Sequence, residues 1–68
     1  MEFGNRLKDL LKEKNISQEA LAKSIGVSQR AVSKWINHQA EPTESSIVNC
    51  AKFFDVSADF ILGLTDII

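Results

Sequence analysis

The chain has 68 residues, of which 44% are hydrophobic and 25% are charged, with three glycines, one proline and one cysteine. This composition argues against a disordered chain, and the length allows one small domain spanning residues 1–68. No apolar run approaches the roughly 18 residues of a membrane span, and charged residues interrupt any signal-peptide pattern. A single cysteine cannot form an internal disulfide, so we expect a cytoplasmic protein.

The charges are distributed unevenly, although the formal net charge is only −1. Residues 1–40 carry seven basic and four acidic residues, a net charge of +3, whereas residues 41–68 carry one basic and five acidic residues, a net charge of −4. Such asymmetry between halves is a pointer to a polyanionic partner, and by itself it is explained equally well by chance.

The first predicted helix ends at Asn15. Its apolar residues recur at helical spacing and share one face, formed by Phe3, Leu7, Leu10 and Leu11. Asparagine tolerates the left-handed conformation in which many helices end, so the helix is expected to stop there.

Two short helices follow, and each begins at a serine. Ser17 and Ser28 are good N-cap residues, because a serine hydroxyl can accept a hydrogen bond from an unpaired amide of the first turn. Gly26 ends the second helix. The apolar residues expected to face inward are Leu21, Ala22 and Ile25 on the second helix and Ala31, Val32, Trp35 and Ile36 on the third.

The second half of the chain predicts a loop and two more helices. Residues 37–42 are polar and contain the only proline, as is typical of a loop. Thr43 then caps a fourth helix that Asp55 ends, and Ser57 caps a short fifth helix with Gly63 as its C-cap. Their inward residues are expected to be Ile47, Cys50, Ala51 and Phe54, then Phe60, Ile61 and Leu62. Because no strand-like alternation occurs, the predicted fold class is all-α, a compact domain of five helices.

The second and third helices together predict a helix-turn-helix over about residues 17–36. Only a few residues separate Ile25 from Ser28, so the third helix must turn sharply across the second. Gly26 supplies a left-handed backbone there, and Ala22 is small where the two helices approach most closely. The apolar seam between them is expected to consist of Leu21, Ile25, Val27, Val32 and Trp35.

The outward face of the third helix carries four hydrogen-bonding side chains, Gln29, Arg30, Ser33 and Lys34. Glutamine can bind an adenine edge, and arginine or lysine can bind guanine O6 and N7, so this set suits bases in a major groove. The helix N-termini at Ser17 or Gln18 and at Ser28 are suited to phosphates. The partner indicated is double-stranded DNA.

Short motifs follow one another along the chain: Arg6-Leu7-Lys8, Ser17-Gln18-x-x-Leu21-Ala22, Ile25-Gly26-Val27-Ser28, Val32-Ser33-x-Trp35, Pro42-Thr43, Ala51-Lys52 and Val56-Ser57-x-Asp59-x-Ile61-Leu62-Gly63. Together they resemble the Cro/phage-repressor (Xre-like) helix-turn-helix family over nearly the whole chain. The resemblance implies a lambda-repressor-like domain that binds palindromic operators as a dimer and represses or otherwise regulates transcription.

The resemblance also implies roles for individual residues. Four residues of the third helix would contact bases: Gln29, Arg30, Ser33 and Lys34, with a phosphate as the alternative for Ser33. Three residues would contact phosphates: Gln18, Ser28 and Asn37, with Gln18 also bridging to the third helix. No catalytic residue and no cofactor is expected, and one histidine and one cysteine cannot supply a usual metal-ligand set.

The chain departs from the family pattern after the third helix. The family commonly has Trp-Glu-Asn-Gly there, and its Glu often pairs with an Arg of the first helix. Here the run is Trp35-Ile36-Asn37-His38, and the first-helix position is Leu11. A packed apolar pair can replace a buried ion pair at little cost, so we expect a Leu11–Ile36 contact. His38 stands where the family prefers glycine, which puts the loop geometry there in question.

The C-terminal tail, residues 64–68, is rich in apolar side chains. Leu64, Ile67 and Ile68 predict a two-fold homodimer patch, and the alternatives are a tail folded onto its own domain or a chain cut from a longer protein. A protein-interaction module is the main alternative to a DNA-binding function, and an enzyme is the least expected. Among single residues, His38 is expected to be a solvated loop residue, and Cys50 and Trp35 are expected to be core residues.

Overall fold

The computed structural model describes residues 2–68, which form five helices and no strand in that part of the chain. The helices are α1 (Phe3–Lys14), α2 (Gln18–Ile25), α3 (Gln29–Ile36), α4 (Glu44–Phe54) and α5 (Ala58–Ile61). The predicted all-α fold of five helices is therefore confirmed. None of the helices in residues 2–68 has the length and apolar character of a membrane span.

Four of the helices begin at the predicted cap residues. The side-chain oxygens of Ser17, Ser28, Thr43 and Ser57 each accept a hydrogen bond from the backbone amide three residues later, at 3.0–3.2 Å. Each bond satisfies one of the amides that a helix N-terminus otherwise leaves unpaired. The starts of α2, α3, α4 and α5 are therefore set by local sequence.

The helix ends also follow local sequence. Asn15, Gly26 and Asp55 all adopt the left-handed conformation, with φ of 57°, 77° and 56°. Gly63 was expected to be the C-cap of the fifth helix, but Leu62 holds that position and Gly63 comes next, with φ of 78°. The helix ends one residue earlier because the glycine takes the left-handed place just beyond the cap, which is where glycine is most favoured.

The core collects the apolar face of every helix. Its buried members are Phe3, Leu7, Leu10, Leu11, Leu21, Ala22, Val32, Trp35, Cys50, Ala51, Phe54 and Ile61. The other predicted inward residues, Ile25, Ala31, Ile36, Ile47, Phe60 and Leu62, are half-buried and pack against this cluster. Trp35 and Cys50 are core residues, as predicted.

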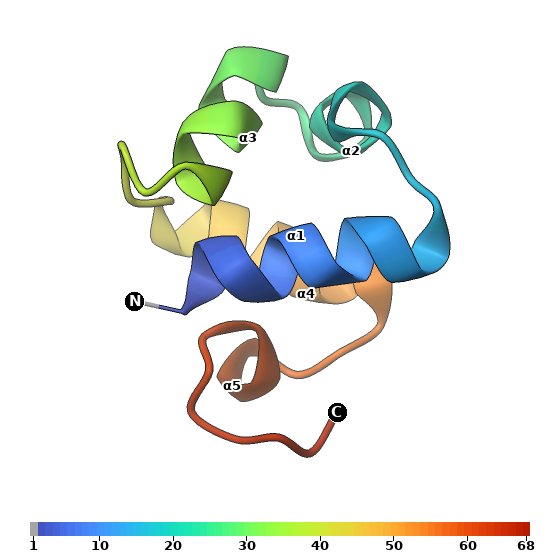
Figure 1. Ribbon diagram of the computed structural model, residues 1–68, viewed down its shortest axis with the longest axis vertical. Helices are drawn as coiled ribbons and strands as arrows, with labels where there is room; N and C mark the ends of the chain where they lie inside the picture. Colours follow the sequence, from blue (N-terminus) through green and yellow to red (C-terminus); the bar gives the residue numbers. More distant parts are fainter. Residues whose placement is uncertain (1) are drawn as a thin grey trace.

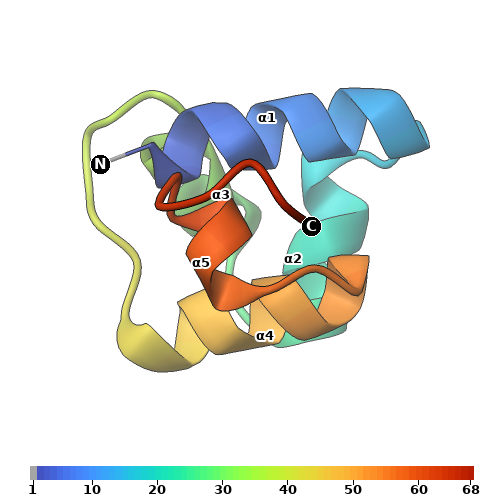
Figure 2. The same ribbon diagram turned by 90° about the horizontal axis from the view of Figure 1, so that it is seen from below.

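The helices enclose this core from several sides. α1 and α4 lie on opposite sides of the domain, as the view from below shows most clearly (Figure 2). α2 and α3 cover one end of the longest axis, and α5 and the C-terminal tail cover the other (Figure 1). The helix-turn-helix and the tail therefore occupy opposite ends of the molecule.

α1 also packs against α3. Leu11 is buried, and Ile36 is half-buried against the core, which is consistent with the expected apolar replacement of an ion pair. The direct contact between Leu11 and Ile36 stays a prediction. Closer to the start of α1, the Phe3 and Trp35 rings meet edge-on, with 5.7 Å between centroids.

Gly4 is required for this approach of α1 to α3. A β-carbon at Gly4 would overlap the backbone carbonyl oxygen of Trp35, whereas one at Gly26 would meet no atom within 4 Å. In an ordinary helix, Gly4→Ala would stabilise the protein. Here we expect it to lower the free energy of unfolding by about 1–3 kcal/mol because the backbones must separate. Urea unfolding followed by circular dichroism measures this change.

Gly26→Ala is the matched control. It should cost about 1–2 kcal/mol through its left-handed backbone alone. Because α1 need not move, native Trp35 fluorescence should be unchanged in Gly26→Ala and altered in Gly4→Ala. A more stable Gly4→Ala protein would contradict the close approach.

Burial raises the pKa of the Cys50 thiol from 9.0 to about 12. Below pH 9 the thiol is protonated in both the folded and the unfolded protein, so its contribution to stability is fully present. As the pH rises from 9 towards 12, the unfolded protein loses this proton first, and stability falls. We expect the difference in unfolding free energy between wild type and Cys50→Ala to narrow between pH 8 and pH 10.5 in urea titrations. An unchanged difference would mean that the thiol ionises equally easily in the folded protein.

Candidate nucleic-acid interface

The connection between α2 and α3 is a tight turn over residues 26–28. The backbone amides of Gly26 and Val27 both donate to the Ala22 carbonyl oxygen, at 2.9 and 3.0 Å. Ser28, the last residue of the turn, is the N-cap of α3. In Figure 1, α2 is seen nearly end-on while α3 runs down the page, so the two helices cross steeply. The predicted helix-turn-helix is confirmed.

The small residue at the crossing is buried, as the sequence suggested. Ala22 and Leu21 are almost inaccessible, and Val32 of α3 is fully buried in the same cluster. Ile25 and Val27 are half-buried beside them. This apolar packing holds α3 against α2, and within residues 2–68 the opposite face of α3 is exposed.

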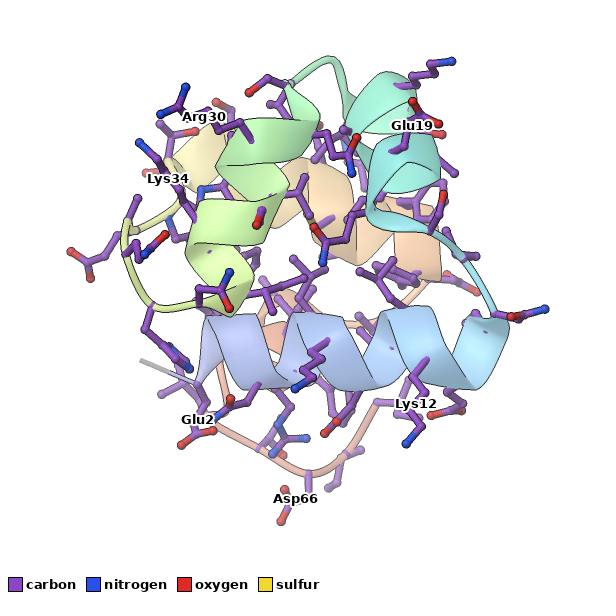
Figure 3. All side chains as sticks on the ribbon, turned by 45° about the horizontal axis from the view of Figure 1, so that its top comes forward. Glu2, Lys12, Glu19, Arg30, Lys34 and Asp66 are labelled. Atoms are coloured by element: carbon purple, nitrogen blue, oxygen red, sulfur yellow. The ribbon has the colours of Figure 1, made fainter. Side chains whose placement is uncertain are left out.

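That outward face carries the four predicted side chains. Gln29, Arg30 and Lys34 are exposed, and Ser33 is half-buried. Figure 3 shows Arg30 and Lys34 extending from α3 away from the body of the domain. Among residues 2–68, neither cation lies within ion-pair distance of an acidic side chain. Both charges are therefore available to an external anion.

The three predicted phosphate contacts flank this face. Gln18 is the first residue of α2 and is half-buried, and Ser28 is exposed, with its side-chain oxygen engaged as the N-cap acceptor. Asn37 follows α3 and donates from Nδ2 to Ser33 Oγ at 3.3 Å. This bond keeps Asn37 on the same side as Ser33.

A series of hydrogen-bonded side chains beside Asn37 was not predicted from the sequence. His38 has φ of 60°, and its Nε2 lies 3.2 Å from Asn5 Oδ1 on the first turn of α1. Asn5 Nδ2 in turn donates to Glu2 Oε1 at 3.1 Å. A histidine in the usual place of a glycine was a signal for the left-handed backbone, but no local pattern points from residue 38 to residue 5.

The tail at the other end of the molecule follows a defined path. Arg6 donates to Asp66 Oδ1 at 2.6 Å, and its guanidinium carbon lies 4.5 Å from the centre of the Phe60 ring. The tail side chains Leu64, Ile67 and Ile68 are nevertheless 73%, 81% and 70% exposed. The alternative that the tail folds onto its own domain therefore does not hold for these three side chains, and the predicted homodimer patch stays a prediction.

The described residues contain no other site with an evident chemistry. Within residues 2–68, no group of three histidine, cysteine, aspartate or glutamate side chains could hold a metal ion. An open hollow lies between the first turn of α1 and the loop after α3, with His38 and Glu41 among its lining residues.

Comparison with known proteins matches residues 7–61 to a family described as helix-turn-helix. The chain belongs to this helix-turn-helix family. The match includes every predicted base and phosphate contact, which all lie between residues 18 and 37, and it stops before the apolar tail. The resemblance to phage repressors is thereby confirmed at the level of the family.

Two curated relatives illustrate the range of this helix-turn-helix family. The HTH-type transcriptional activator BcrR of Enterococcus faecalis is 38% identical over 68 residues, which is 100% of this chain and 33% of BcrR. Repressor protein C2 of Salmonella phage P22 is 34% identical over 60 residues, which is 88% of this chain and 28% of C2. The chain thus spans about a third or less of these two relatives.

Solved structures agree with the sequence comparison. The DNA-binding domain of the P22 C2 repressor, determined in solution, superposes with a TM-score of 0.82 at 33% identity, over 88% of this chain and 79% of that one. The P22 c2 repressor in complex with a synthetic operator gives a TM-score of 0.81 at 32% identity, over 87% and 89% of the two chains. The restriction-modification controller protein C.AhdI of Aeromonas hydrophila gives 0.82 at 28% identity, over 88% and 91%.

Proposed function

We propose that this helix-turn-helix domain binds double-stranded DNA sequence-specifically and acts as a cytoplasmic transcriptional regulator, most simply a repressor. The observation that carries the proposal is the outward face of α3, where Arg30 and Lys34 extend into solvent beside Gln29, with no acidic partner within residues 2–68. Unpaired cations next to an amide form a surface that suits base edges and phosphates together.

Each predicted contact residue keeps its role in this proposal. Gln29, Arg30, Ser33 and Lys34 contact bases in the major groove. Gln18, Ser28 and Asn37 contact phosphates and set the register of the helix. The hydrogen bond between Asn37 and Ser33 supports a shared side for these two residues. No catalytic residue, metal or cofactor is assigned.

The relatives support this proposal and leave the direction of regulation to experiment. The P22 c2 repressor has been solved in complex with a synthetic operator, and it resembles this chain over most of its length. C2 is named a repressor, whereas BcrR is named a transcriptional activator. The choice of repressor therefore rests on the resemblance to phage repressors.

Selection from a random pool of duplex DNA tests the function directly. The purified protein is expected to enrich a palindrome with half-sites about 10 bp apart, one turn of the double helix. A single short half-site would indicate a monomeric reader. Failure to enrich any sequence at low salt would overturn the DNA-binding proposal and favour a protein-interaction module.

Arg30→Ala should weaken binding to the selected duplex by about 1–3 kcal/mol and relax the preference at one base position. Lys52→Ala is the matched control, because Lys52 is also an exposed cation but lies on α4. Fluorescence anisotropy titrations on the selected duplex and on single-base variants give both quantities. An equal loss of affinity on every duplex would show that Arg30 contacts the backbone rather than a base.

The proposal includes a homodimer formed through the apolar tail. Leu64, Ile67 and Ile68 are highly exposed, and side chains of this kind are unfavourable in water unless a partner covers them. Substituting all three with serine should shift the monomer–dimer balance towards monomer in sedimentation equilibrium. Lys52→Ser is the control, because it also introduces a serine at an exposed position but leaves the tail and its contact with Arg6 unchanged. If the triple variant self-associates like the wild type, the dimer uses another surface.

A further inference from the structure

The path of the C-terminal tail is defined by contacts with α1. Arg6 of α1 donates to Asp66 Oδ1 at 2.6 Å, and its guanidinium carbon lies 4.5 Å from the centre of the Phe60 ring on α5. A β-carbon at Gly63 would overlap the side chain of Glu2, so the chain passes directly against the start of α1 there. The tail therefore leaves α5 in a direction that α1 determines.

Hydrogen bonds within the second half of the chain also order the tail. The amide of Leu64 donates to the Asp59 carbonyl oxygen at 2.9 Å, and the amide of Ile67 donates to Thr65 Oγ1 at 3.2 Å. The side chains of Leu64, Ile67 and Ile68 are nevertheless exposed. Ordering a backbone costs conformational entropy, and apolar side chains that stay in water do not offset that cost. A single copy of the chain thus gains no burial of these three side chains from the ordered tail.

The rim of the tail surface carries charges of both signs. Figure 3 shows Glu2, Lys12 and Asp66 on the side of α1 that faces away from α3. The Asp66 side chain is 93% exposed in spite of its bond to Arg6, so it can meet a second cation. A two-fold interface brings the same surface of two copies together, so the acid of each copy can face the cation of the other. The surface is therefore complementary in charge to a second copy of itself.

We propose that Arg6 is a positioning residue for the homodimer, because it holds the tail so that Leu64, Ile67 and Ile68 are already presented to a second copy of the chain. The inference rests on the homodimer included in the proposed function, and it names the residue that prepares the dimer surface. A surface that is ordered before association does not lose the entropy of ordering the tail when the two copies meet.

Arg6→Gln tests this role, because it removes the charge and keeps a polar side chain. The ion pair and the cation–π contact are each weak at an exposed site, but both occur in each copy of the dimer. We expect the dissociation constant of the dimer to rise by about tenfold in sedimentation equilibrium. Arg6→Lys keeps the charge and should lose less. Lys8→Gln is the matched control, because Lys8 is a cation of the same helix that forms no ion pair within residues 2–68.

Asp66→Asn removes the same ion pair from the side of the tail. If Arg6 and Asp66 act through their contact, a protein with both changes should dissociate like Arg6→Gln alone. Two losses that multiply would show that these residues act separately, and the positioning role would be wrong. Because Asp66 is almost fully exposed, its substitution leaves the fold intact. Should Arg6→Gln fail to fold by circular dichroism, a wild-type dissociation constant in Asp66→Asn would still overturn the proposal.

The outcomes separate this inference from the proposed homodimer. If the variant with three serines in the tail dissociates while Arg6→Gln dimerises like the wild type, the homodimer stands and Arg6 does not position it. If the wild type is a monomer at every concentration, a second copy does not cover the tail, and the homodimer and this inference fail together.

Discussion

The contact between the end of α3 and the first turn of α1 constrains the rest of the interface. The Trp35 ring meets Phe3, and the Trp35 carbonyl oxygen lies against Gly4, where no side chain separates the two backbones. At its other end α3 is held by the turn at Gly26. A helix of eight residues that is fixed at both ends cannot rotate, so its polar face remains directed to solvent.

The two ends of the molecule present different chemistry. At the α3 end, Arg30 and Lys34 are unpaired cations within the described chain, and at the tail end Arg6 is occupied by Asp66 and Phe60. Ion pairs with an exposed partner contribute little stability, so the Arg6 contacts mainly define the path of the tail. The surface at the α3 end is therefore suited to anions, and the surface at the tail end is suited to apolar partners.

Local sequence predicted the helix boundaries well. Four hydroxyl caps and three left-handed ends stand at the predicted positions, because each depends on interactions within about four residues along the chain. The apolar faces of the helices were predicted equally well, since helical periodicity decides which side chains can be buried together. The exception at Gly63 is a shift of one residue, within the usual uncertainty of helix ends. The DNA contacts proposed for the α3 residues are a different kind of prediction, because they depend on a DNA partner as well as on the fold.

Local sequence patterns were sufficient to predict the five helices, their caps, the helix-turn-helix and the polar set on α3. Three other features depend on how the helices pack together: the missing side chain at Gly4, the pairing of Arg6 with Asp66, and the bond between His38 and Asn5. Residues 6 and 66 are 60 positions apart, and residues 5 and 38 are 33 positions apart. Such contacts follow from how whole helices pack around a shared core. Propensity and periodicity describe single helices, so they carry no information about which surface residues of different helices become neighbours.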